Sequence, residues 1–158
     1  MAAMDRRREF LALSATLTGF SVFRLEGTGQ TDAYLGALTD IVGEATVDAL
    51  AAVHRRVVDA AGGDEARLER GLRRELLSDA KLGPVARNLI KLWYVGTWHE
   101  LPAAWREAFG AGTRDRTFVV SPEAYTEGLL WPAVGANPAG AKPFGYGMWA
   151  KPPRIETA

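Results

Sequence analysis

Apolar side chains recur at three- and four-residue steps in the middle of the chain, from Leu82 to Trp105. Pro84 stands near the start of this segment, in the first helical turn, where a missing N–H leaves no hydrogen bond unmade. A helix that is apolar on most sides is buried on most sides. We therefore predict a central helix on which only Arg87, Asn88 and Lys91 are polar. Its apolar positions are Val85, Leu89, Ile90, Leu92, Trp93, Tyr94, Val95 and Gly96.

The same spacing predicts shorter helices on both sides of the central one. Asp5 is a suitable N-cap for the first helix and Gly19 a suitable end, whereas the glycines within residues 20–30 indicate a loop. Since little strand is expected, we predict an all-α fold, a single-domain helical bundle around the central helix. Further helices are expected at residues 31–42, 44–61, 64–79, 102–110 and 121–131, with residues 117–120 as a lone strand. The expected apolar side of 31–42 is Ala33, Leu35, Leu38, Ile41 and Val42.

The pattern changes at Pro132, because the segment to Pro153 holds five of the eight prolines and four glycines. Such a segment is unsuited to a helix or a central strand, so we expect an extended C-terminal tail. Aromatic side chains are spaced along it and must be buried somewhere. The tail either wraps around its own helical body or lies across a partner. The residues expected at a partner interface are Trp131, Phe144, Tyr146, Met148 and Trp149.

Length and net charge limit the class of protein and the partners that can be expected. The 158 residues carry no net charge and are 47% hydrophobic, which is typical of one soluble globular domain. Without a basic excess there is no reason to expect a nucleic-acid partner. No apolar run approaches the roughly 20 residues of a membrane-spanning helix, so no direct membrane span is expected. Within the one domain, we divide the chain into an N-terminal segment and first helix (1–30), a helical body (31–131) and the tail (132–158).

The chain contains no cysteine, which excludes thiolate-bound iron–sulfur clusters, covalently attached haem and a disulfide framework. No glycine-rich dinucleotide motif follows a strand, and no cluster of side chains has the spacing of metal ligands. We therefore expect no cofactor, no metal and no catalytic residue in this chain.

Near the N-terminus, Arg7 and Arg8 precede Phe10 and Leu11 in the order found in twin-arginine export signals. A moderately apolar stretch follows, and the nearest sequence of small residues for cleavage is at residues 27–29. The same residues also fit a charged first turn followed by the apolar face of a helix. Both interpretations stand on the sequence alone.

Two histidines offer the remaining candidate chemistry. His99 beside Glu100 supplies the residue types of an acid–base pair, so a small helical enzyme is one alternative function. The competing role for His99 is that of a residue at the C-terminal end of the central helix. His54, next to two arginines, is expected to be a surface or capping residue. A free-standing helical scaffold or chaperone is a further alternative.

Three segments together resemble a known family. They are FLALSATLTGF near the start, LLSDAKLGPVARNLIKLWYVGTW in the middle and ANPAGAKPFGYGMWAKPP at the end. The chain resembles the small subunit of membrane-bound, FAD-dependent sugar and polyol dehydrogenases, such as sorbitol, fructose and glucose dehydrogenase complexes. The resemblance covers nearly the whole chain, and the arrangement of Gly140 to Ala150 is its most specific part.

The resemblance implies that this chain is not the catalyst. A large subunit would bind FAD and oxidise the substrate, and a multihaem cytochrome c subunit would pass electrons to the membrane. The small subunit would assist the folding and twin-arginine export of the large one. The resemblance therefore implies a periplasmic location, at the inner membrane through the complex.

Overall fold

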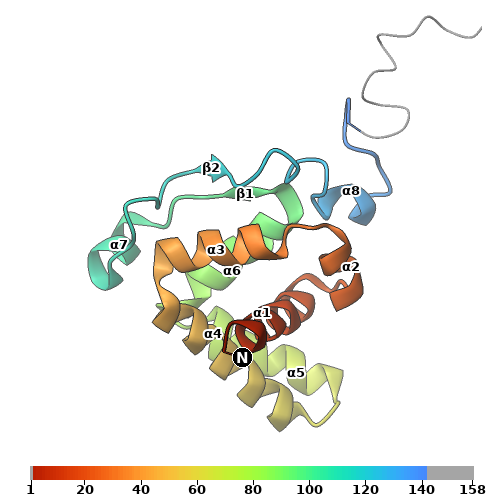
Figure 1. Cartoon of the computed structure of the whole chain (residues 1–158). Coiled ribbons are helices and arrows are strands. Elements are labelled where there is room, and N and C mark those ends of the chain that lie inside the picture. Colours follow the sequence, from red (N-terminus) through yellow and green to blue (C-terminus); the bar gives the residue numbers. More distant parts are fainter. Residues whose placement is uncertain (1, 142–158) are drawn as a thin grey trace, which may run out of the picture.

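The computed structural model describes residues 2–141, and their secondary structure confirms the expected all-α fold (Figure 1). Helix α6 (Leu82–Val95) lies at the centre, where α1, α4 and η1 contact it. The other elements are α1 (Ala2–Thr18), α2 (Val22–Gly27), α3 (Thr31–Val42), α4 (Glu44–Ala61), α5 (Glu65–Gly71), the π-helical turn η1 (Leu72–Leu77), α7 (Ala103–Phe109) and α8 (Leu130–Ala133). Two short strands, β1 (Thr97–Trp98) and β2 (Phe118–Val119), complete the fold.

The core is organised around the Trp93 side chain of α6, which is 1% exposed. The Phe10 ring of α1 stacks on the indole with 6.1 Å between the ring centroids. The Tyr34 ring of α3 meets it edge-on at 4.9 Å. Aromatic rings in these arrangements attract one another beyond what their buried area contributes. Three helices that are distant in sequence are thus held together at one side chain.

The predicted apolar face of α3 is partly wrong, because the helix turns Tyr34 and not Ala33 towards the core. Tyr34 is buried, whereas Ala33 is exposed. The bounds predicted for α4 are those observed, and Gly62 ends it in the left-handed conformation with φ +57°.

The N-terminal elements differ from the prediction in two places. Helix α1 begins at Ala2, so Asp5 lies within its first turn and is not its N-cap. The expected loop at residues 20–30 contains α2, whose N-cap Ser21 accepts the Arg24 N–H at 3.2 Å. Leu25 of α2 is fully buried. One capped turn with one buried leucine is enough to form this helix, because α1 packs beside it.

Helix α6 ends at Gly96, which takes the left-handed conformation with φ +70°. A Cβ atom at this position would lie 2.5 Å from the Ala124 carbonyl oxygen, so only glycine fits. Asn88, one of the few polar positions of the helix, is buried. Its side chain exchanges two hydrogen bonds with the backbone of His99, accepting the N–H at 3.2 Å and donating to the carbonyl oxygen. These bonds fasten the chain after β1 to the central helix.

The strand expected to be alone has a partner. Strand β2 pairs antiparallel with β1, with Trp98 opposite Phe118. The buried carboxylate of Asp115 organises the loop between them, because it accepts the indole N–H of Trp98 at 3.0 Å and the Leu101 N–H at 3.2 Å. Hydrogen bonds to this one carboxylate therefore hold the segment of residues 97–119 in place, in addition to apolar packing.

The helix predicted at residues 121–131 does not form as one element. Residues 122–127 are turns, and α8 begins only at Leu130. The physical reason is that the Leu129 N–H bonds to another helix and not within its own segment. It donates to the Trp93 carbonyl oxygen at 3.0 Å, which satisfies a carbonyl in the last turn of α6. Pro132 lies inside α8 rather than ending it, since a proline in a first helical turn lacks no needed N–H.

Candidate docking surface

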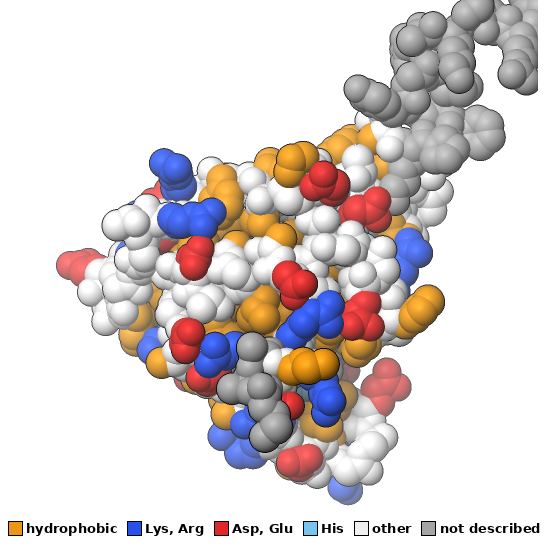
Figure 2. Space-filling model, in the orientation of Figure 1, with side chains coloured by type: hydrophobic (Ala, Val, Ile, Leu, Met, Phe, Trp, Pro, Cys, Tyr) orange, Lys and Arg blue, Asp and Glu red, His pale blue; other side chains and the backbone are white. Residues whose placement is uncertain are grey.

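Large apolar side chains remain exposed at the end of the molecule formed by α2 and residues 125–134. Figure 2 shows hydrophobic side chains along the edge of the molecule near α8. Phe23 of α2 is 87% exposed and Val134 is 62% exposed. The other large apolar side chains exposed on these two segments are Val22, Tyr125 and Leu130. An aromatic ring as open as Phe23 contributes nothing to the core and is typical of a surface that meets another molecule.

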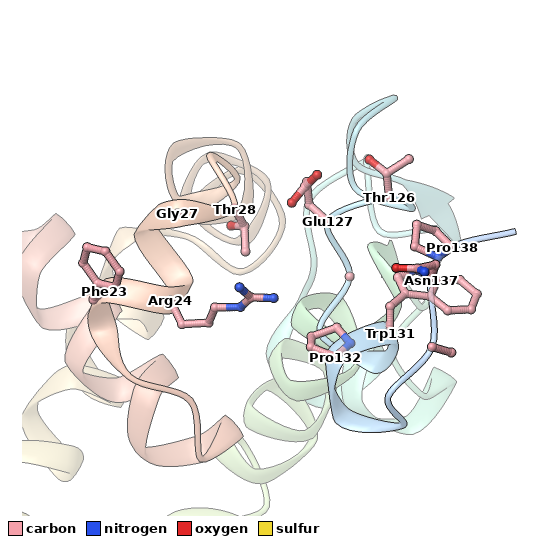
Figure 3. A pocket seen from close by; sticks show the side chains of 12 residues that line it. Phe23, Arg24, Gly27, Thr28, Thr126, Glu127, Trp131, Pro132, Asn137 and Pro138 are labelled. Carbon is pink, nitrogen blue, oxygen red and sulfur yellow. The ribbon is translucent and has the colours of Figure 1, made fainter. Parts of the chain in front are cut away.

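A groove of about 470 Å³ separates the two segments, with residues 23–28 on one wall and residues 126–138 on the other. We call it the α2–α8 groove. In Figure 3 the Arg24 side chain extends from α2 towards the opposite wall, on which Trp131 and Pro132 lie. Glu127 lines the groove as well, on the wall opposite Arg24. The groove therefore combines aromatic and proline side chains with polar ones, a guanidinium and a carboxylate group among them.

Each wall is fixed to the body. On the first, Leu25 is fully buried and Glu26 forms an ion pair with Arg7 of α1 at 2.9 Å. On the second, the Leu129 N–H donates to the Trp93 carbonyl oxygen of α6 at 3.0 Å. Within that wall, the Trp131 indole donates to the Tyr125 carbonyl oxygen at 2.7 Å, and the two rings meet edge-on at 5.3 Å. Both walls are thus preorganised, which reduces the entropy that docking must offset.

The structure describes only part of the predicted partner interface. Trp131 is half-buried on the second wall of the groove, with its indole N–H already bonded within the chain. Phe144, Tyr146, Met148 and Trp149 lie outside the described residues. The first ten residues of the expected tail, 132–141, are only partly extended, because residues 132–133 end α8 and residues 134–135 and 139–141 form turns, and Pro138 between the turns is buried. The described chain ends at Ala141, three residues beyond the groove-lining Pro138.

The four residues of the export-like motif all lie on α1. Arg7 donates to Asp32 at 3.0 Å and to Glu26 at 2.9 Å, and these hydrogen bonds, chiefly that to Glu26, raise the pKa of Arg7. Arg8 is exposed. Phe10 and Leu11 are 2% and 3% exposed and belong to the core.

His99 and Glu100 lie on one shallow groove of about 200 Å³ beside α6. The Glu100 carboxylate is paired with Arg106, and His99 is held through its backbone by Asn88. Within residues 2–141 no hydrogen bond joins the two side chains, so the alternative of an acid–base pair gains no geometric support. Nor does this part of the chain contain a group of three or more His, Asp or Glu side chains placed to hold a metal ion.

The expectation that His54 is a surface or capping residue is wrong. His54 is buried, and its Nε2 atom lies 2.8 Å from the Thr16 hydroxyl of α1. Burial, and to a lesser degree the neighbouring charge of Arg55, lowers the pKa of His54. The histidine thus joins α4 to α1 by a hydrogen bond.

Among the described helices, none is both long and apolar enough to cross a membrane. No family model, curated protein or solved structure matches the chain.

Proposed function

We propose that this protein is a non-catalytic subunit that docks on an FAD-dependent sugar or polyol dehydrogenase. The C-terminal tail and the α2–α8 groove form the docking surface. FAD belongs to the large subunit of this complex and haem c to a cytochrome subunit, while this chain supplies binding surface only. A periplasmic position of the complex at the inner membrane is part of the same proposal.

The observation that carries the proposal is the open apolar surface around the α2–α8 groove. Phe23, at 87% exposure, is more open than any other large apolar side chain described. A monomer gains nothing from such a ring in water, whereas aromatic side chains that enter a partner commonly dominate interface energies. Arg24 and Glu127, which both line the groove, favour a partner element that presents polar groups between apolar side chains. The resemblance of the three sequence segments supplies the class of partner.

The proposal is tested by affinity purification of the tagged chain from its native host. We expect a larger, FAD-containing chain to purify with it and to oxidise a sugar or polyol, whereas the chain separated from this partner shows no flavin absorbance. A purified chain that retains flavin itself, or that turns over substrate alone, would contradict the proposal.

Two valine substitutions test whether the groove is the docking surface. Val134 beside the groove and Val119 on β2 are similarly exposed, at 62% and 57%. We expect Val134→Ser combined with Phe23→Ser to weaken association with the flavoprotein at least tenfold, about 1.4 kcal/mol or more. The matched variant Val119→Ser should leave association unchanged. Unchanged association of the double variant would place the interface elsewhere.

A further inference from the structure

Helix α1 contributes more to the core than a removable segment can. Phe10, Leu11 and Leu13 are each at most 3% exposed, and Ser14 on the same side is fully buried. Phe10 stacks on Trp93, the centre of the core. Removal of these side chains would expose that indole and the surrounding faces of α3, α4 and α6, all of which contact α1.

Polar contacts hold α1 along its whole length. Near its start, Arg6 pairs with Asp48 of α4 at 3.1 Å. In its middle, Glu9 pairs with Arg55 of α4, and in its last turn the Thr16 hydroxyl meets His54 of α4. At its end, the Tyr94 hydroxyl of α6 donates to the Thr18 carbonyl oxygen at 2.9 Å. Contacts to two different helices, distributed over several turns, indicate that α1 is part of the folded unit.

We propose that the folded body conceals Phe10 and Leu11 of the Arg-Arg-x-Phe-Leu sequence, and that residues 2–29 remain a permanent part of the body rather than a signal that is removed. The two arginines are not equivalent, because Arg7 is bound by Glu26 and Asp32 whereas Arg8 is exposed. A receptor that reads Phe10 and Leu11 must first take α1 out of the core. An export receptor therefore cannot bind Phe10 and Leu11 while the chain is folded.

This inference does not depend on the proposed docking function, but it bears on it. Cleavage at the small residues 27–29 would remove both α1 and α2, including the wall of the α2–α8 groove that carries Phe23 and Arg24. A docking surface built on α2 requires the N-terminal segment to stay.

Hydrogen exchange of the intact purified chain, followed by mass spectrometry, tests the inference directly. We expect the amides of residues 9–18 to exchange at least ~100-fold more slowly than in an unstructured peptide, as those of α6 do, because helices that share one core open together. Protection of α6 with less than ~100-fold protection of residues 9–18 would overturn it, since α1 would then be a detachable leader.

The mass of the chain isolated from its native host gives an independent readout. We expect residues 2–29 to be present in the protein recovered with or without its partner. A folded form that begins between residues 19 and 30 would overturn the inference while leaving the docking proposal to be judged by its own purification experiment.

Discussion

Buried polar atoms near Trp93 differ in whether they have a partner. The Tyr34 hydroxyl, the Trp93 indole N–H and the hydroxyls of Ser14 and Thr31 are buried without a hydrogen-bond partner among the described residues. The Tyr94 hydroxyl, in contrast, donates to the Thr18 carbonyl oxygen. Burial, and secondarily the charge of Glu127, raises the pKa of Tyr34 above its usual range, so this phenol stays neutral. An unpaired buried hydroxyl destabilises a fold where a paired one stabilises it.

We therefore predict opposite effects for two chemically identical substitutions. Tyr34→Phe removes an unpaired hydroxyl and keeps the ring that meets Trp93, so the free energy of unfolding should stay unchanged or rise by up to ~1 kcal/mol. Tyr94→Phe removes a hydrogen bond between α6 and α1 and should lower it by ~1 kcal/mol. Urea unfolding followed by circular dichroism measures both. Equal losses in the two variants would mean that the Tyr34 hydroxyl has a partner.

His54 makes stability depend on pH. Burial lowers its pKa in the folded chain below the ordinary value of about 6.5, so the unfolded chain binds more protons at mildly acidic pH. The stabilisation is fully present above about pH 6.5 and is lost as the pH falls from there through the folded pKa. We expect the melting temperature to fall between about pH 7 and pH 5, and His54→Gln to remove most of that fall. An unchanged pH dependence in this variant would show that His54 does not titrate on unfolding.

The predicted and observed positions of Trp93, Phe10 and His54 show what a local sequence pattern can reveal. The apolar spacing correctly predicted that Trp93 faces the core, because helical periodicity is a local property of the sequence. For Phe10 it offered the apolar face of a helix as one of two interpretations, and Phe10 is buried. The local pattern placed His54 on the surface, since neighbours such as Arg55 and Arg56 dominate a local window. The partner that keeps His54 inside is Thr16, 38 residues away. Polar pairs of this kind are not visible without the fold.

At the scale of elements, the same distinction separates α4 from α2. Helix α4 has 18 residues of continuous amphipathic pattern and a terminal glycine, and the sequence predicts its bounds. Helix α2 has six residues, too few for a periodic signal. The available signal was the capping serine, Ser21, followed by Leu25 four residues later. One wall of the candidate docking groove was therefore missed because short helices depend on tertiary packing rather than on their own pattern.

Asp115, in the segment between α6 and β2, could not be predicted either, because no apolar pattern indicates that this carboxylate is buried. We expect Asp115→Ala to lower the free energy of unfolding by ~2–3 kcal/mol, because it leaves the Trp98 indole N–H and the Leu101 N–H without an acceptor. Asp40→Ala is the matched control: this carboxylate is 52% exposed and pairs with Arg114 at 2.6 Å, so its loss should cost less than ~1 kcal/mol. Similar losses in both variants would deny Asp115 its organising role.

At the scale of the whole molecule, we expect the helical body to determine stability and the tail to contribute to docking. The body is closed around Trp93 by α1, α3 and α6. Five of the ten large apolar side chains that are exposed in the described part lie on α2 and residues 125–134, beside the place where the described chain ends (Figures 1 and 2). The fold class followed from sequence because apolar periodicity fills most of the chain. The position of the groove did not, since it depends on how α2 and residues 126–138 meet in space.

Two truncations separate the contributions of tail and groove. A chain that ends at Ala141 keeps all the described contacts, so its melting temperature should equal that of the full chain. It loses the aromatic side chains of residues 144–149, and removal of two interface anchors at ~2 kcal/mol each would weaken docking on the flavoprotein by roughly a thousandfold. A chain that ends at Val134 also loses the buried Pro138 and the hydrogen bond from the Tyr125 hydroxyl to the Ala139 carbonyl oxygen.

We expect this shorter chain to melt at a lower temperature and to dock no better than the one ending at Ala141, because one wall of the groove is then incomplete. Thermal unfolding by circular dichroism and titration with the purified flavoprotein measure both properties on the same samples. A chain ending at Ala141 that melts much earlier than the full chain, yet binds the flavoprotein with unchanged affinity, would reverse the assignment. The aromatic side chains beyond residue 141 would then be structural elements of this chain's own body, and the partner would have to be bound through the groove alone.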